Sequence, residues 1–117
     1  MIKVGTKRIH RDGRELESMA FVISVRPGED LEAEFGRVVE ALYEWHKEQG
    51  ERCAALTVGF EASEQDQEKL MAYLVSLIQQ ERPLRPLFAQ LGQVMVGLVS
   101  PDGKHIKEMP VKIEFSI

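Results

Sequence analysis

The side chains best suited to bind a metal ion do not stand at metal-binding spacings. They are His10, His46, His105 and Cys53. No two of them form a Cys-x-x-Cys or His-x-x-x-His pair. His46 lies between Glu44 and Glu48, but residues two positions apart on a helix point in different directions. The sequence therefore predicts neither a bound metal nor another cofactor.

The nucleophilic side chains also lack the partners that catalysis requires. Cys53 is the only cysteine and opens an apolar stretch, whereas a reactive thiolate needs an electropositive, partly exposed setting. No serine lies in a Gly-x-Ser-x-Gly motif. The stretch after Gly92 lacks the Lys-Ser/Thr pair of a phosphate-binding loop. These patterns favour a protein without enzymatic activity. The enzymatic alternative needs a pocket that gathers distant residues, such as His46 and a carboxylate.

A basic stretch lies near the amino terminus, around a turn signal. Residues 1–28 carry six Lys/Arg and three Asp/Glu, and the cations cluster around Asp12-Gly13, a pair that favours tight hairpin turns. A basic two-stranded ribbon can follow phosphates or enter a groove, although no aromatic residue is interleaved to stack on bases. Nucleic-acid binding is therefore the alternative hypothesis. Its candidate residues are Lys7, Arg8, Arg11 and Arg14.

The middle of the chain is strongly acidic. Residues 29–68 carry twelve Asp/Glu and three Lys/Arg, a net charge of −9 in a chain whose total is −4. A helix expected there would turn most of its glutamates to solvent, and such a face can dock on a basic surface, with an aromatic anchor. We therefore expect a non-enzymatic protein-binding module of the inhibitor, immunity or adaptor type. The candidate contact residues are Glu40, Tyr43, Glu44, Lys47 and Glu48.

Hydrophobic periodicity predicts the elements that position both candidate sites. Residues 2–25 are expected to form a β-hairpin, with a bulge near Gly5 because Ile9 is out of phase with the earlier apolar residues. A helix is expected from Asp30, whose carboxylate can cap it, to Gln49. Its apolar stripe consists of Leu31, Phe35, Val38, Leu42 and Trp45.

A strand and a second helix should follow. The stretch 52–62 predicts a central strand covered on both sides, because neither of its faces is strongly polar. A helix opens at Ser63 with a capping box and must end near Arg82, because Pro83 cannot continue it. Residues 83–86 match Pro-x-x-Pro, but their place between two apolar elements favours a stop and restart between helices.

The last part of the chain predicts three strands. They cover residues 94–100, 105–109 and 111–117, with a turn at 101–104. Pro110 is expected to interrupt the return strand, which suggests an edge of the sheet or a bend. The final strand alternates cleanly, so it could lie at a sheet edge and pair with a second copy to form a homodimer.

These elements predict an α+β fold. The expected architecture is one mixed or mainly antiparallel sheet of about five to six strands, with two main helices on one face, in the order ββ-α-β-α-β-β-β. A length of 117 residues with 44% hydrophobic residues predicts a single domain over 1–117. No apolar run is long enough to cross a membrane. The single cysteine and the polar amino terminus favour a cytoplasmic location.

Overall fold

A computed structural model of the protein describes residues 2–26, 28–104 and 106–114. Short 3₁₀ turns, η1 (Gly50–Arg52) and η2 (Arg82–Leu84), follow the first two helices. The helices and strands are β1 (Ile2–Arg11), β2 (Arg14–Ser24), α1 (Leu31–Gln49), β3 (Cys53–Glu61), α2 (Glu64–Gln80), α3 (Arg85–Leu91), β4 (Gln93–Val99) and β5 (Ile106–Lys112).

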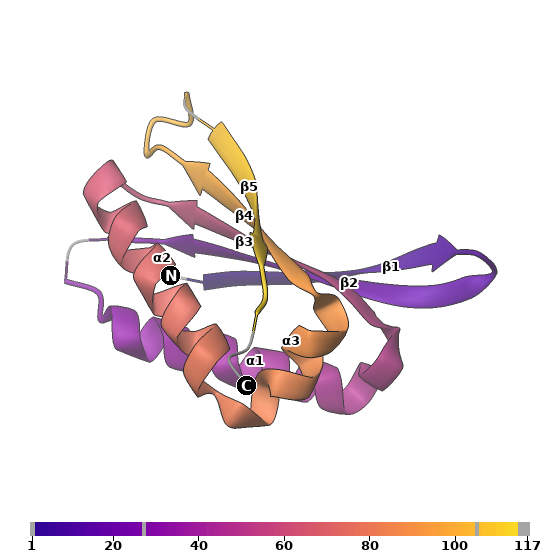
Figure 1. The fold of residues 1–117 in the computed structure, drawn as a ribbon. Coiled ribbons are helices and arrows are strands. Elements are labelled where there is room, and N and C mark those ends of the chain that lie inside the picture. Colours follow the sequence, from indigo (N-terminus) through magenta and orange to yellow (C-terminus); the bar gives the residue numbers. More distant parts are fainter. Residues whose placement is uncertain (1, 27, 105, 115–117) are drawn as a thin grey trace.

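The five strands form one mixed sheet in sequence order. The outer pairs β1–β2 and β4–β5 are antiparallel, whereas β2–β3 and β3–β4 are parallel. Parallel neighbours need a crossover, and two right-handed crossovers that advance in the same direction place their helices on the same face. All three helices accordingly lie along one face of the sheet (Figure 1). The prediction of an α+β fold with a mixed sheet and helices on one face is confirmed.

The core lies between that face and the helices. Phe21 and Ile23 of β2 and Val58 and Phe60 of β3 are fully buried there. The predicted stripe of α1 is confirmed, because Phe35, Val38, Leu42 and Trp45 are buried and Leu31 packs against the cluster. This packing fixes the orientation of α1 about its own axis.

Local end signals account for both long helices. The Asp30 carboxylate accepts a hydrogen bond from the Glu32 N–H at 3.0 Å, and Ser63 Oγ accepts one from the Asp66 N–H at 3.4 Å. Each bond satisfies an amide that the first helical turn leaves unpaired. Gly50 ends α1 with a positive φ of 54°, which glycine adopts without a steric penalty.

The hairpin differs from its prediction. β1 and β2 pair without a break from Ile2 opposite Ile23 to Arg11 opposite Arg14, so the bulge expected near Gly5 is wrong. Ile9 simply faces the side of the sheet opposite to Ile2. The irregularity lies instead between β2 and β3 at Glu17 and Ser18. The predicted Asp12-Gly13 turn is confirmed, with positive φ at both residues.

Strand β3 is central, as predicted, but the described elements cover only one of its faces. Leu56, Val58 and Phe60 are buried under the helices, whereas Thr57 is exposed and Gly59 is half-buried on the opposite face. The expectation of coverage on both sides is therefore wrong. Its physical reason is that both crossovers run on the same side of the sheet.

The prediction for the first proline-containing segment is confirmed, and the prediction for Pro110 is confirmed in part. Residues 82–91 form η2 and α3, with Leu84, Leu87 and Phe88 buried, so 83–86 is not an extended Pro-x-x-Pro ligand. At Pro110 the predicted interruption is wrong, because β5 continues through it opposite Met95, but the predicted edge is confirmed, because β5 is an outer strand of the sheet. An edge strand tolerates this, since one row of its amides needs no partner in the sheet.

The edge position of β5 is the one that pairing with a second copy would require. Val111 and Ile113 pack against the core. The predictions made for Pro27, His105 and 115–117 lie outside the described residues.

Candidate functional site

The five candidate contact residues of α1 all lie on its exposed side. Because the apolar stripe faces the sheet, Glu40, Glu44 and Glu48, spaced four residues apart, form one ridge on the outside. Tyr43 and Lys47 lie beside this ridge, and Tyr43 is 49% exposed. Within the described ranges, none of the three glutamates takes part in an ion pair.

A hollow of about 340 Å³ lies on one flank of this ridge. Val39 and Leu84 supply apolar surface to it, and its carboxylates come from α1 and from Glu81, which lies between α2 and η2. Its lining residues are Val39, Glu40, Tyr43, Glu44, Glu81, Pro83 and Leu84. Sequence reasoning missed the contribution of Glu81 and Pro83, because only the fold brings η2 beside α1.

A second cavity, of about 470 Å³, lies on the other flank, between α1 and the hairpin. It brings Glu44 and Glu48 of the first candidate set together with Arg8 of the second. Glu17 and Trp45 also line this cavity, and the sequence predicted neither of them as a site residue. The full lining is Thr6, Arg8, Glu17, Met19, Ala41, Glu44, Trp45, Glu48 and Gln49.

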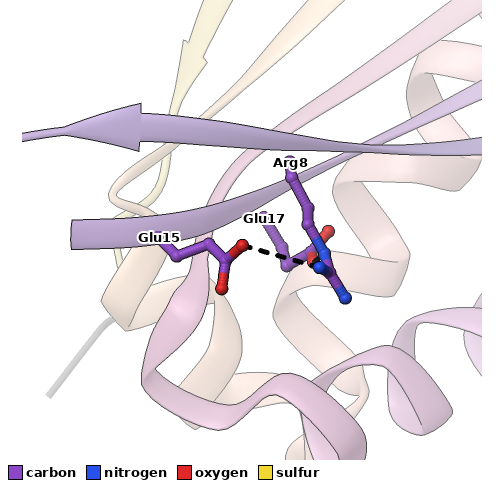
Figure 2. A network of polar contacts seen from close by, with 3 residues as sticks. All are labelled: Arg8, Glu15 and Glu17. Carbon is purple, nitrogen blue, oxygen red and sulfur yellow. Dashed lines mark hydrogen bonds and ion pairs between the residues drawn. The ribbon is translucent and has the colours of Figure 1, made fainter.

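A small polar network holds Arg8 in place at this cavity. Arg8 Nε donates to Glu17 Oε1 at 3.3 Å, and Nη1 donates to Glu15 Oε1 at 3.5 Å. Figure 2 shows the guanidinium beside these two carboxylates of β2. Glu17 is only 7% exposed, and a buried carboxylate is stable only when it is paired or hydrogen-bonded. Arg8 therefore serves the hairpin itself.

The other three basic candidates lie on the opposite side of the hairpin from Arg8. Side chains alternate along a strand, so Lys7 and Arg11 share one side, and Arg14 joins them because it pairs with Arg11. All three are exposed. The hairpin end that carries Arg11 and Arg14 extends beyond the rest of the sheet (Figure 1), because β3 pairs with β2 only from Glu17 to Ser24.

Cys53 is a buried core residue, as predicted. It is 2% exposed, and its thiol lies 3.8 Å from the Trp45 carbonyl oxygen, to which it can donate. Burial, assisted by the negative charge of Glu17, raises the pKa of the Cys53 thiol to about 11. The thiol is therefore protonated at neutral pH and is a poor nucleophile.

The described residues offer no metal site and no membrane-spanning helix. Among the described residues there is no group of three His, Cys, Asp or Glu side chains arranged to hold a metal ion. His46 is half-buried on α1 and lines neither of the two hollows beside that helix. No described helix is long and apolar enough to cross a membrane.

Comparison of the chain with protein-family models, with curated proteins and with solved structures found no match.

Proposed function

We propose that the protein is a non-enzymatic binding module that docks on a basic surface of another protein through the outer face of α1. The observation that carries this proposal is the ridge of Glu40, Glu44 and Glu48 with the half-exposed Tyr43 beside it. The opposite side of the same helix is fixed in the core, so the ridge is presented by a rigid element. Preorganised groups lose little entropy on binding.

The physical chemistry of this face suits a basic partner. Carboxylates aligned on one ridge attract a cationic surface and orient it during encounter. Tyr43 can then contribute apolar area and a hydroxyl group near the centre of the contact, as aromatic residues often do at interfaces. Binding of this kind is expected to weaken as salt screens the charges.

The nucleic-acid alternative rests on the exposed Arg11 and Arg14 at the end of the hairpin. It has less support, because Arg8 is engaged with Glu15 and Glu17 and Asp12 lies between the two arginines in the sequence. Nucleic-acid affinity measured at low salt tests it. Absent affinity, or affinity unchanged by Arg11→Ala with Arg14→Ala, would dismiss it.

A matched pair of charge reversals tests the docking proposal. One variant carries Glu40→Lys and Glu44→Lys. The control carries Glu64→Lys and Glu68→Lys, which are exposed and also four residues apart, but on α2. Proteins captured from a native lysate of the source cell would be quantified by mass spectrometry for each variant, after circular dichroism has shown that both fold.

The α1 variant is expected to lose its specific partner about tenfold or more, the scale of interface hot spots, whereas the α2 variant keeps it. Equal recovery by the wild type and the α1 variant would remove this face from consideration.

A further inference from the structure

We propose that the cavity between α1 and the hairpin receives a lysine or arginine side chain of the docked protein. This inference rests on the proposed function, which it sharpens by naming the group that the partner inserts. The cavity borders the ridge of α1, since Glu44 and Glu48 belong to both. A partner lying along α1 therefore has this cavity within reach.

The charges around the cavity favour a cation. Three carboxylates line it, those of Glu17, Glu44 and Glu48, against the single guanidinium of Arg8. Arg8 is already bonded to Glu15 and Glu17, whereas Glu44 and Glu48 have no ion pair within the described part of the chain. An incoming ammonium or guanidinium group would thus meet two carboxylates that no cation of the described residues pairs with.

The walls of the cavity suit the alkyl stem of such a side chain. Met19, Ala41 and Trp45 supply apolar surface beneath the carboxylates. Lysine and arginine side chains lay their methylene stems along apolar surface while the charged head meets polar groups. A volume of about 470 Å³ also falls within the range of small ligand sites, about 300–1,000 Å³.

Trp45 provides an observation that does not depend on charge. It lines the cavity and is 4% exposed, and its indole N–H is buried without a hydrogen-bond acceptor among the described residues. Buried N–H groups in proteins are rarely left unpaired, and leaving one so costs about 1–3 kcal/mol. A side chain that enters the cavity lies against this indole ring, so the Trp45 N–H reports its entry.

The single tryptophan of the chain makes the proposal directly measurable. An isotope-labelled sample gives one indole N–H signal by nuclear magnetic resonance, that of Trp45. The probe is a capped Gly-Arg-Gly peptide, and the control probe is the same peptide with citrulline, which is uncharged and nearly isosteric. We expect the arginine peptide to shift the Trp45 signal in a saturable way, and the citrulline peptide to shift it several-fold less.

Two conservative variants on α1 separate insertion from general attraction. Glu48→Gln removes a cavity carboxylate, and Glu40→Gln removes one from the same ridge outside the cavity. Glu48→Gln is expected to weaken peptide binding about threefold to fivefold, the scale of one partly exposed charge pair, whereas Glu40→Gln changes it by much less. Equal shifts with both peptides, or equal weakening by both variants, would overturn the inference.

The outcomes also distinguish the two proposals. If reversal of Glu40 and Glu44 abolishes partner capture while the arginine peptide leaves the Trp45 signal unmoved, docking stands and insertion falls. If the arginine peptide shifts the signal but the reversal leaves capture intact, docking through α1 fails.

Discussion

The outer face of α1 and the end of the β1–β2 hairpin carry opposite charges, and the fold holds those charges in different ways. Glu40, Glu44 and Glu48 of α1 stand on one ridge of a helix whose other side packs into the core. The cations of the hairpin lie on both of its sides, and one of them, Arg8, forms an ion pair with the buried Glu17. Charge counted along the sequence marks both regions, but only the pairing and the packing show which charges are free to meet a partner.

The largest expected effect is a difference in stability between substitutions on the buried and on the exposed side of α1. Leu42→Ala should lower the free energy of unfolding by about 2–5 kcal/mol, because it leaves a cavity in the core. The adjacent Tyr43→Ala should cost less than about 1 kcal/mol, because Tyr43 is half-exposed. Urea denaturation measures both. A comparable loss for Tyr43→Ala would mean that this side chain holds the fold together and is not available as an anchor.

The next prediction concerns the reactivity of Cys53, which lies where α1 meets the hairpin. Its thiol contacts Trp45 of α1 and lies near Glu17 of β2. With the Cys53 pKa raised from 9.0 to about 11, the thiolate fraction of the native protein at pH 8 is about a hundredfold smaller than that of the unfolded chain. A more basic thiolate is also more nucleophilic, so the native thiol should react with a disulfide reagent at least about tenfold more slowly than the unfolded chain does. Reaction at the same rate with and without denaturant would contradict the burial of this thiol.

The raised pKa of Cys53 also predicts how the free energy of unfolding changes with pH. The unfolded chain releases the thiol proton first, so this group should reduce the free energy of unfolding as pH rises from about 9 towards 11. Glu17→Gln should lower the pKa of Cys53, because it removes a nearby negative charge, and should speed the reaction with the reagent.

A smaller difference in stability is expected between substitutions of two arginines of the hairpin. Arg8→Ala is expected to destabilise the fold by about 1 kcal/mol, because it leaves the Glu17 carboxylate buried without its partner, discounted for the exposure of Arg8. Arg11→Ala should change the free energy of unfolding by less than about 0.5 kcal/mol. Thermal denaturation compares the two variants. Equal losses would show that Arg8 has no special structural role.

The smallest effect lies on the ridge of α1 itself. Gly36 is exposed, and a methyl group added there would meet nothing within 4 Å. Gly36→Ala should therefore stabilise the protein by about 0.5–1 kcal/mol, because alanine loses less backbone entropy in a helix. The midpoint of urea denaturation gives the answer, and a decrease would show that this turn of α1 is packed against another element.

Local sequence signals predicted the helices, strands and turns. Strand register and the coverage of the sheet depend on how distant segments pair, and there the predictions were wrong. The cap at Asp30, the turn at Asp12-Gly13 and the stripe of α1 could be predicted because each depends on a few neighbouring residues. The bulge near Gly5 and the break at Pro110 were wrong, since strand register and strand length depend on pairing across the whole sheet, whereas the edge expected at Pro110 was right. The coverage of β3 was wrong because the sequence pattern does not show on which side the crossovers run.

The candidate site divides in the same way. The exposure of Glu40 and Tyr43 could be predicted, because the apolar stripe fixes the opposite side of the helix. The cavity could not be predicted, because Arg8, Glu17 and Trp45 come together only when α1 packs on the face of the sheet formed by β1 and β2. One signal was present in the sequence. Glu17 continues the inward alternation of β2 after Ile23, Phe21 and Met19, which marks it as a carboxylate on a buried face.

Photocross-linking tests docking through α1 most directly. Tyr43 is replaced by a benzophenone amino acid, and in a separate sample Arg14 at the end of the hairpin is replaced in the same way. Both proteins are irradiated in a native lysate of the source cell. We expect position 43 to give defined adducts with proteins that carry a basic surface, and Glu40→Lys with Glu44→Lys to remove them. Adducts at position 14 alone, or adducts at position 43 that survive the charge reversal, would contradict docking through α1.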